Sequence, residues 1–590
     1  MTHVLAVVGG GPRATYALER LSAQLDRLGP GQRLKVLVFE RSGEFGAGQA
    51  HSPSQPATSF LNRVSSQVSF AADETTTGAG PLRTSRRTLH EWCRERYART
   101  GEPDLDLGPA DWPRRYVHGL ALREAFDSYA ADLRAHPRAE LELHHAEVVR
   151  LRAGRRLLLQ TADGRRFEAD QALLVTGHTH HDPLRGEPSR SRARFAAATG
   201  CHYVPYAYPL DRLPEETGTV GVAGTGLTAI DVILHLTEGR GGRFEPVAGG
   251  LRYVPSGAEP RRVVAFSGSG LFTFCRADDE KGDRAHQGVH LTTEAIDRLR
   301  ERHPEGLDFE RDVLPLIERE MAYLYEAAGG GSFDFARTVD PLASAGAHTP
   351  EAYRKAVLDF MELDQRRAEE GNVTNPHKAA ADGVWRDLRH VISYAVDDGG
   401  LTPGSHRDFL DRWVRVHNRL GNGAAPEVMA RLQALIRHGV LDVGAGPGAR
   451  VRTTGRRFEV NGPVTGAVYG IDTLVEGRVH PFDPRLDANP LFRRMLADGT
   501  VRLWRNGGFT PGGLDLDARG RPVRVDGTAE ERIGVLGPPT EGRRSFQLSA
   551  LRPGTDHYVM RDVLAWLSGF WEVLGRPEPA AGCQPGGPNT

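Results

Sequence analysis

The chain has 590 residues, of which 39% are hydrophobic and 26% are charged, and its 75 Lys and Arg residues nearly balance 76 Asp and Glu residues. This length exceeds what one hydrophobic core supports, so two or three domains are expected. A formal net charge of -1 provides no overall attraction to nucleic acid or to an anionic membrane. The four cysteines form no C-x-x-C pair, which argues against a disulfide framework and fits a reducing cytoplasm. No run reaches the ~18 apolar residues of a membrane span, and the apolar start is too short for a signal peptide.

The first motif joins a predicted strand to a predicted helix through a glycine-rich turn. The apolar run Val4 to Val8 leads into Gly9, Gly11 and Ala14 in the spacing G-x-G-x-x-A. Gly9 lets the chain reverse, Gly11 leaves room for a pyrophosphate, and Ala14 keeps the helix close to the strand. The free amides at the start of the helix would then face an anion. The motif therefore predicts a dinucleotide-binding turn.

An acidic residue ends the second predicted strand. The strand covers Leu34 to Phe39, and Glu40 follows it. A carboxylate at this position commonly binds a ribose hydroxyl, which favours an adenine dinucleotide whose ribose carries no phosphate. The loop that follows, up to Asp73, is long and rich in Gly, Ser and Pro. We expect its centre, residues 60–68, to pack over the cofactor; the alternative is a solvated surface loop.

Two amphipathic helices are predicted over residues 88–100 and 118–135. Their buried faces are expected to contain four aromatic side chains: Trp92, Tyr97, Phe126 and Tyr129. From Glu140 to Glu168 the hydrophobic period changes to two, which predicts a three-stranded meander with a turn at Asp163 and Gly164. A buried strand over residues 172–177 follows.

Three histidines, His178, His180 and His181, stand at the end of that strand. They lack a carboxylate or cysteine at ligand spacing, so we expect a polar loop near the cofactor and no metal site.

The same arrangement of strand, turn and helix appears a second time. A strand through Val220 and Val222 meets Gly224, Gly226 and Ala229 in the same spacing, before an apolar helix. The next strand, residues 262–266, ends in Ser267 without an acid, which favours NADPH over NADH because no carboxylate would repel a 2′-phosphate. Arg261 and Arg262 precede this strand and either bind that phosphate or are solvated.

Residues 270–440 contain several segments with apolar residues three and four apart, which predicts a helical insertion. We interpret it as a cap that shapes a substrate pocket or a subunit interface. Residues 272–276 and 278–281 join it to the second nucleotide domain and are expected to face the ligand cavity. Strands are then expected at residues 451–460, 471–477, 502–508 and 533–536, with a hairpin over residues 513–527. The strand at residues 471–477 would close the second nucleotide domain, and the strand at residues 533–536 would return to the first sheet. The final helix, Tyr558 to Val573, is expected to bury four side chains: Val563, Leu564, Leu567 and Phe570.

These elements predict an α/β fold with two Rossmann-like dinucleotide-binding domains, a β-meander and a large helical insertion. The expected division has six parts: a first nucleotide domain over residues 1–185, a second over 186–275, the insertion over 276–440, a return to the second domain over 441–480, a return to the first over 481–574, and a disordered tail over 575–590.

Seven segments resemble a known family: GGGPRA at 9–14, SFLNRVSSQVSF at 59–70, LLVTGH at 173–178, GTGLTAID at 224–231, LTEGRGGRFE at 236–245, NPHKAAADGVWRDLR at 375–389 and LGPPTEG at 536–542. With the two turns, they make the chain resemble bacterial FAD/NAD(P)-binding flavoproteins that include the nitrosuccinate-forming aspartate N-monooxygenases. The amino-acid N-hydroxylating monooxygenases are a more distant resemblance.

The resemblance implies sites for both nucleotides. The FAD site would comprise Gly9, Gly11, Pro12, Arg13, Ala14, Glu40, Arg41, Thr176, Gly177, Gly537 and Thr540. The site for NADPH or NADH would comprise Gly224, Gly226, Leu227, Thr228 and Ala229. Asn62, Arg63 and Gln67 are the candidate catalytic residues, placed by the resemblance near the flavin ring. Where the family usually has a small Thr after the Asn, this chain has Arg63, which either binds a substrate carboxylate or points outward.

The resemblance implies a monooxygenase that uses FAD and NAD(P)H to N-hydroxylate an amino acid or other small amine in specialised metabolism. Molecular oxygen would be the co-substrate, and the reaction would pass through a flavin C4a-hydroperoxide. Neither nucleic acid nor a membrane is an expected partner, and a homo-oligomer is possible. Two alternatives stay open: an NAD(P)H-dependent flavin reductase without oxygen insertion, and a nucleotide-sensing protein without turnover. The absence of a redox cysteine pair argues against a disulfide reductase, and the absence of a G-x-S-x-G motif argues against a hydrolase.

Overall fold

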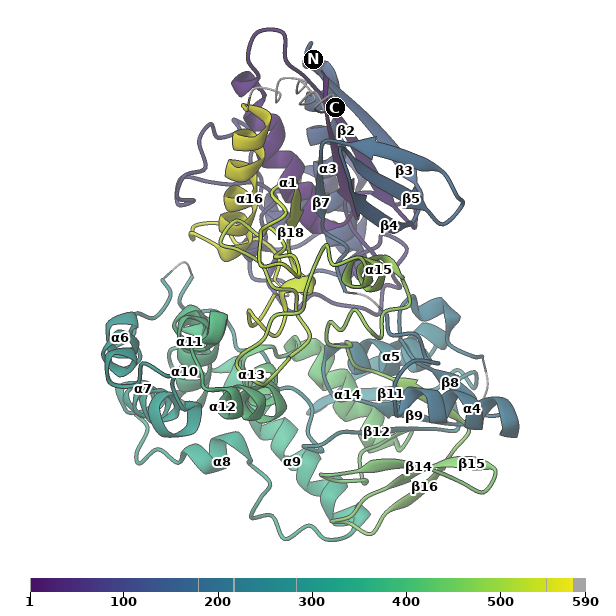
Figure 1. Ribbon diagram of the computed structural model, residues 1–590. Coiled ribbons are helices and arrows are strands. Elements are labelled where there is room, and N and C mark those ends of the chain that lie inside the picture. The colour runs from purple at the N-terminus through teal and green to yellow at the C-terminus, as the bar shows by residue number, and fades with distance from the viewer. Residues whose placement is uncertain (1, 179, 216–217, 283, 548, 577–590) are drawn as a thin grey trace, which may run out of the picture.

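A computed structural model describes residues 2–178, 180–215, 218–282, 284–547 and 549–576. The molecule has an upper lobe that contains both ends of the described chain and a lower part with a sheet on one side and helices on the other (Figure 1). The tail predicted to be disordered lies outside the described residues from 577 onward.

The upper lobe is built on a five-stranded parallel sheet in the order β18-β7-β1-β2-β3. Its strands are Ile533–Val535 (β18), Gln171–Leu174 (β7), Thr2–Val8 (β1), Arg33–Glu40 (β2) and Ala139–His145 (β3). The helices of this lobe are Pro12–Ala23 (α1), Leu89–Thr100 (α2), Arg115–Ala135 (α3) and Tyr558–Leu574 (α16). α1 packs between α3 and α16, and its apolar side chains share one core with theirs. The pairing of β18 with β7 confirms that the end of the chain returns to the first sheet.

The prediction of a meander over Glu140 to Glu168 was partly wrong. β3 pairs in parallel with β2 and is the edge strand of the first sheet, so its alternating pattern reflects one covered and one open face. The antiparallel meander is formed by Val148–Ala153 (β4), Leu157–Thr161 (β5) and Arg166–Ala169 (β6).

The lower lobe contains a second five-stranded parallel sheet in the order β13-β12-β9-β17-β8. Its strands are Leu441–Asp442 (β13), Arg262–Phe266 (β12), Thr219–Ala223 (β9), Thr473–Glu476 (β17) and His202–Val204 (β8). Smaller antiparallel pairings accompany it: Arg243–Val247 (β10) with Gly250–Val254 (β11), and Arg450–Thr454 (β14), Arg457–Asn461 (β15) and Val468–Ile471 (β16) in one three-stranded sheet. The helices of this lobe are Ser189–Thr199 (α4), Leu227–Thr237 (α5) and Pro426–His438 (α14).

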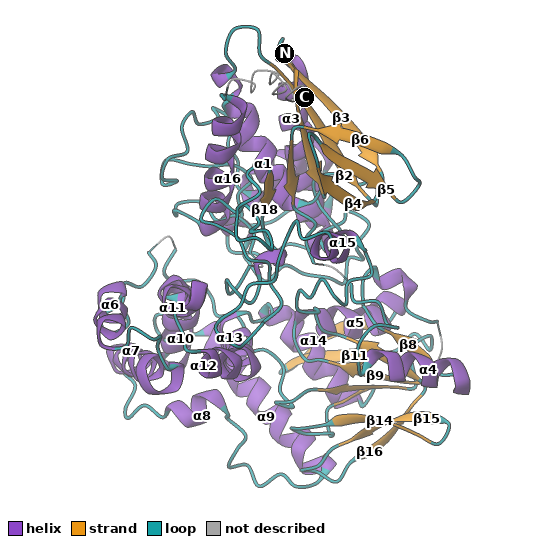
Figure 2. Ribbon diagram, in the orientation of Figure 1, coloured by secondary structure: helices purple, strands orange, loops and turns teal. Residues whose placement is uncertain are grey.

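The insertion is helical, and Figure 2 shows it as a separate group without strands beside the second sheet. Its helices are Thr293–Arg302 (α6), Leu314–Ala327 (α7), Phe335–Val339 (α8), Pro350–Glu369 (α9), Pro376–Asp382 (α10), Arg389–Val396 (α11), Pro403–Asp408 (α12) and Val414–Gly421 (α13). Three π-helical turns interrupt them, at Phe309–Val313, Gly383–Asp387 and Phe409–Trp413. The insertion has its own core, built around Trp385, Trp413 and Phe409.

Three local predictions are corrected. Tyr97 is 36% exposed, because α2 turns only Leu89, Trp92 and Cys93 inward. Leu564 is only partly buried. Residues 502–508 form no strand and make only isolated bridges, such as Leu503 with Leu514; the helix of this region is Leu491–Ala497 (α15). No helix among the described residues is both long enough and apolar enough to cross a membrane.

Candidate functional site

The first glycine turn follows β1 directly. Gly9 has a φ of +105°, and a Cβ there would lie 2.3 Å from the carbonyl oxygen of Val175, so only glycine fits. Its amide donates to Phe39 O at 2.9 Å, which ties the turn to the end of β2. Helix α1 begins after Gly11 without a side-chain cap and has Pro12 in its first turn, and Ala14 is fully buried against the sheet. The turn therefore offers uncapped helix amides, a geometry suited to a pyrophosphate.

Glu40 lies beside this turn at the carboxyl end of β2. Its Oε2 accepts a hydrogen bond from the Gly10 amide at 2.8 Å, and its Oε1 accepts one from the Ser42 amide at 3.0 Å. The neighbouring Arg41 is exposed and donates to Gln49 Oε1 at 3.0 Å. Both predicted residues thus stand at the rim of the turn, where a ribose would be reached.

Segments from the ends of β7 and β18 complete this edge of the first sheet. The Thr176 hydroxyl is buried without a partner in the described structure, and Gly177 and Gly537 have φ angles of +68° and +82°. A buried hydroxyl without a partner is costly, so this position suits a polar group of a ligand. Thr540 is different, because its hydroxyl donates to Gly537 O at 2.8 Å and its side chain lines a small pocket.

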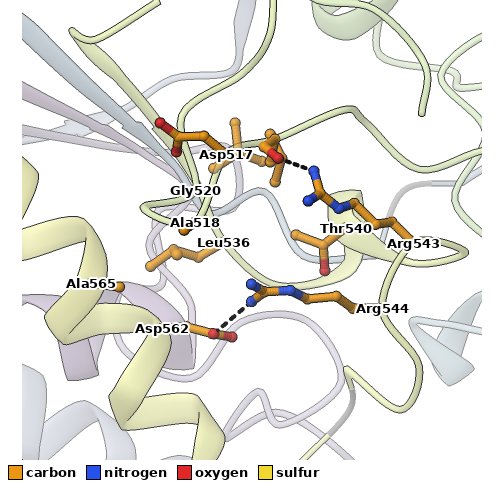
Figure 3. A pocket seen from close by; sticks show the side chains of 11 residues that line it. Asp517, Ala518, Gly520, Leu536, Thr540, Arg543, Arg544, Asp562 and Ala565 are labelled. Atoms are coloured by element: carbon orange, nitrogen blue, oxygen red, sulfur yellow. Dashed lines mark hydrogen bonds and ion pairs between the residues drawn. The ribbon is translucent and has the colours of Figure 1, made fainter. Parts of the chain in front are cut away.

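The pocket beside Thr540 is not a strong ligand site. Figure 3 shows its two arginines, Arg543 and Arg544, directed at oxygen acceptors of the pocket wall. Arg544 donates to Asp562 at 2.8 Å, and Arg543 contacts Asp515 at 3.2 Å. Arg13, predicted to bind FAD, also turns to this C-terminal segment: it donates to Gln547 O at 3.3 Å and lies over the Tyr558 ring.

The second glycine turn repeats the geometry of the first. Gly224 has a φ of +142°, a Cβ there would lie 2.4 Å from Gly477 O, and its amide donates to Phe266 O at 2.9 Å. Helix α5 follows Gly226 without a side-chain cap and begins with Leu227 and Thr228. A Cβ at Gly226 would meet nothing within 4 Å, so the turn is open. Both turns can therefore receive a dinucleotide phosphate.

Two arginines that were considered as ligands of a coenzyme phosphate lie at the edge of this sheet opposite the glycine turn. Arg261 and Arg262 stand at the amino end of β12, whereas the turn lies at the carboxyl end. Arg261 donates to Thr219 Oγ1 at 3.1 Å, and Arg262 lies 3.9 Å from Asp442. Neither can reach a nucleotide bound at Gly224.

The long loop after β2 connects the two lobes. Gly48 lies against Gly11, while the next residue, Gln49, donates to Tyr208 O at 3.3 Å in the lower lobe. Farther along the loop, Phe60 is buried in the core of the second nucleotide domain. The loop is therefore a structural bridge and not a solvated surface segment.

A buried ionic network holds this bridge in place. Arg115, at the start of α3, forms an ion pair with Asp231 of α5 and donates to Phe60 O at 2.9 Å. It also contacts the Tyr208 hydroxyl at 2.9 Å. Burial alone would lower the pKa of Arg115, but the Asp231 carboxylate raises it above its usual value. The network joins one helix of each nucleotide domain.

The three predicted catalytic residues meet the insertion. Arg276 Nε donates to the Asn62 carbonyl at 3.2 Å, and Gln67 donates to Asp279. Arg386 lies 3.5 Å from the Gln67 amide oxygen. Arg63 points inward and donates to Ser549 Oγ at 3.0 Å. Arg276 and Asp279, from the segments expected to face the ligand cavity, thus contact the loop that contains Asn62 and Gln67.

An arginine cluster surrounds this loop: Arg63, Arg276, Arg386, Arg389 and Arg552. Burial, and then the neighbouring arginines, hold the pKa of Arg63 well below its usual range. The same causes lower the pKa of Arg276 to about 9 and that of Arg552 to about 10. Among the described residues, only Arg386 of this cluster has a close carboxylate, Asp382 at 2.7 Å, which raises the pKa of Arg386 although burial alone would lower it.

Several buried polar atoms around the cluster have no partner in the described structure: Nη1 of Arg63, Nη1 of Arg276, both ring nitrogens of His417, Nε2 of His557 and Oε1 of Gln547. Arg276 is only 4% exposed. A small, partly open pocket adjoins the cluster, and its lining includes Gln67, Asp279, Lys281, Arg386 and Arg552. Unpaired buried donors beside a pocket indicate an anionic ligand. Of these arginines, Arg63 and the end of segment 272–276 were expected at the site. Arg386 and Arg389 were not expected there, although both lie in segment 375–389, which takes part in the family resemblance.

The three histidines after β7 do not converge. His178 Nε2 lies 3.6 Å from a carboxylate oxygen of Glu541. The His180 ring lies against the Tyr206 ring, and its Nε2 contacts Gln49 at 3.0 Å. The His181 ring stacks on that of His480. Within the described ranges, no group of three or more His, Cys, Asp or Glu residues could hold a metal ion.

Comparison with known proteins agrees with this geometry. A family model described as FAD-NAD(P)-binding matches residues 6–179. An L-aspartate N-monooxygenase (nitrosuccinate-forming) from Streptomyces cremeus is 34% identical and covers 95% of this chain and 93% of its own length. Nitrosuccinic acid synthase from Aspergillus oryzae is 32% identical over 95% of this chain and 92% of its own. Among solved structures, ornithine hydroxylase from Pseudomonas aeruginosa covers 97% of this chain and 100% of its own with 12% identity and a TM-score of 0.42, a likeness too low to support an inference. The chain belongs to the family of FAD- and NAD(P)-dependent N-oxidising monooxygenases that includes the nitrosuccinate-forming L-aspartate N-monooxygenases.

Proposed function

We propose that this enzyme N-oxidises an amino acid with an anionic side chain, and that L-aspartate is its substrate. The observation that supports the proposal is the arginine cluster, whose buried guanidinium groups have unpaired donors beside a pocket. The relatives from Streptomyces cremeus and Aspergillus oryzae have names that describe the same conversion, and they align with nearly the whole chain.

The charge balance of the cluster requires an anion. Five arginines come together, but among the described residues only Arg386 has a carboxylate within ion-pair distance. The nearby Asp387 is paired with Lys281 at 3.0 Å. Burying an unpaired cation costs several kcal/mol, and removing one partner of a buried ion pair costs about 3–5 kcal/mol. L-Aspartate brings two carboxylates, which match planar guanidinium groups through paired hydrogen bonds.

The same positive potential assists the chemistry of the amine. N-oxidation requires a free amine with a lone pair, whereas an amino acid in water near pH 7 is an ammonium ion. Nearby positive charges lower the pKa of an ammonium group, because they destabilise its charged form. Arg276 and Arg63 would therefore bind the carboxylates and also favour the neutral, nucleophilic amine.

The two glycine turns fit the two nucleotides that the family binds. We assign FAD to the first glycine turn, because uncapped helix amides and an unpartnered hydroxyl meet there. The assigned residues are Gly9, Gly11, Pro12, Ala14, Glu40, Thr176, Gly177 and Gly537. We assign NAD(P)H to Gly224, Gly226, Leu227 and Thr228. When bound, FAD supplies the reduced flavin that activates molecular oxygen. Arg41 stands at the rim of the first turn, within reach of the FAD ribose, and Arg13 and Thr540 act by holding neighbouring backbone.

The loop residues have positioning roles in this proposal. Asn62 holds Arg276 through its carbonyl group, and Gln67 joins Asp279 to Arg386. The three contacts connect the first nucleotide domain to the insertion around the substrate. A site closed in this way excludes water, which limits loss of oxidising equivalents as hydrogen peroxide.

The test measures oxygen consumption and NADPH oxidation by the purified holoenzyme with L-aspartate, L-asparagine and L-ornithine. We expect L-aspartate to stimulate both, and L-asparagine, which lacks the second carboxylate, to do so far less. Arg276→Gln should raise KM for L-aspartate about 10- to 100-fold, the loss expected for one charge-assisted contact. Its FAD content and anaerobic reduction by NADPH should stay unchanged.

Arg412→Gln is the matched control, because Arg412 is exposed and pairs with Glu310 at 2.8 Å away from the cluster. Equal stimulation by L-asparagine, or an unchanged KM in Arg276→Gln, would refute the role of the cluster. Peroxide release with every amine and no N-oxidised product would refute the proposed function.

A further inference from the structure

The two nucleotide turns of this chain differ at one equivalent position. In the first domain the Gly9 amide donates to Phe39 O, and the next residue is Glu40. In the second domain the Gly224 amide donates to Phe266 O, and the next residue is Ser267. Glu40 and Ser267 therefore occupy the same place relative to their turns. This is the place from which a dinucleotide fold reads the adenosine ribose.

The end of β12 has hydroxyls where β2 has a carboxylate. Ser267 Oγ accepts from the Gly270 amide at 3.1 Å, and the Thr225 hydroxyl lies 2.9 Å away. Ser269 Oγ lies 3.3 Å from Ser267 Oγ. These contacts fix the Ser267 oxygen at the strand end, where its hydroxyl can donate either to Ser269 or to a bound ligand. Because Gly268 has no side chain, the strand end is accessible from the insertion.

A cation from the insertion reaches this strand end. Arg415, in the first turn of α13, places Nη1 3.7 Å from the position that a Cβ of Gly268 would take. Arg415 is exposed, and no carboxylate in the described part of the chain lies within 4.0 Å of its side-chain nitrogens. By contrast, Arg412, three residues earlier, pairs with Glu310.

We propose that Ser267 and Arg415 bind the 2′-phosphate of NADPH, so that the helical insertion sets the coenzyme preference of the second nucleotide domain. A guanidinium group pairs well with a dianionic phosphate, and a serine hydroxyl adds a donor. In NADH the same position holds only a hydroxyl, which offers Arg415 no anion. The inference rests on the coenzyme assignment made under the proposed function and adds the residues that select between NADPH and NADH.

The binding test uses calorimetry on the FAD-loaded protein with 2′,5′-ADP and 5′-AMP, without any amino acid. Arg415→Gln should weaken binding of 2′,5′-ADP about 10- to 100-fold and leave 5′-AMP within about twofold, the loss expected for a charge-assisted contact. Arg412→Gln should change neither ligand. Equal weakening of both ligands in Arg415→Gln, or no weakening of either, would overturn the proposal.

A kinetic test follows flavin absorbance during anaerobic reduction by NADPH and by NADH. The wild-type protein should bind NADPH more tightly than NADH, and Arg415→Gln should weaken NADPH alone. Ser267→Glu, which copies Glu40 of the first domain, should lower the preference for NADPH by repelling the phosphate. A wild-type protein without preference, or a Ser267→Glu protein with unchanged preference, would contradict the assignment. Neither test contains L-aspartate, so failure of the substrate proposal would leave these results unaffected.

Discussion

The buried pair of Arg115 and Asp231 offers the sharpest test of how the two lobes are joined. The two side chains are 9% and 4% exposed, and Arg115 Nη2 lies 3.3 Å from Asp231 Oδ1 in addition to the closer Nη1 contact. Asp231→Asn keeps the shape of the side chain but leaves a buried guanidinium group without its counter-ion. Breaking a buried pair in this way costs about 3–5 kcal/mol.

Urea unfolding followed by tryptophan fluorescence measures this cost. Asp231→Asn should lower the free energy of unfolding by about 3–5 kcal/mol. The double variant Arg115→Met with Asp231→Asn should lose less than the sum of the single variants, because the unpaired charge is gone. Lys355→Met is the control: Lys355 and Asp359 form an exposed pair, for which about 0.5 kcal/mol is expected. A loss below about 1 kcal/mol in Asp231→Asn would refute the argument that this pair fastens the domains.

Two further predictions separate the parts of the site. Gly224→Ala should abolish anaerobic flavin reduction by NADPH but retain FAD. The added Cβ would lie 2.4 Å from Gly477 O and would disturb only the second turn. Loss of FAD as well would show that the two turns are not independent. The side chain of Glu541 is only 22% exposed, and desolvation raises its pKa to about 8. The folded state therefore binds the extra proton, and stability falls as pH rises from about 4.5 towards 8. Glu541→Gln should remove this slope of up to about 1.4 kcal/mol per pH unit, measured as urea midpoints at several pH values, and an unchanged slope would count against it.

Both glycine turns could be predicted because their determinants are local. Strand, glycines and helix lie within about twenty consecutive residues, and a positive φ at Gly9 or Gly224 excludes other residue types wherever the turn is packed. The return of β18 to the first sheet was also predictable, since an apolar run near the end of the chain needs a covered sheet. The residue-level roles assigned to these turns stay predictions.

The errors have identifiable physical causes. β3 alternates because it is an edge strand with one open face, so its pattern resembles a strand of a meander. Tyr97 matched a helical period, but α2 is covered on too narrow a face to bury it. Arg261 and Arg262 were considered for coenzyme binding without regard to strand direction, which places them at the amino end of β12.

The arginine cluster could not be predicted as a unit. Its members come from a loop of the first domain, the start of the insertion, a π-helical turn and a helix farther along the insertion, and the C-terminal segment. No single sequence window shows that these arginines belong together, and only tertiary packing makes them neighbours. The long-range contacts of Arg276 with Asn62 and of Arg386 with Gln67 are examples.

The most direct test of the central claim is mass spectrometry of products formed from L-aspartate, NADPH and ¹⁸O₂ by the holoenzyme. We predict an N-oxidised derivative of aspartate with ¹⁸O bonded to nitrogen, formed in amounts that follow NADPH consumption, and its loss in Arg276→Gln. Release of hydrogen peroxide without a labelled nitrogen product would contradict the account.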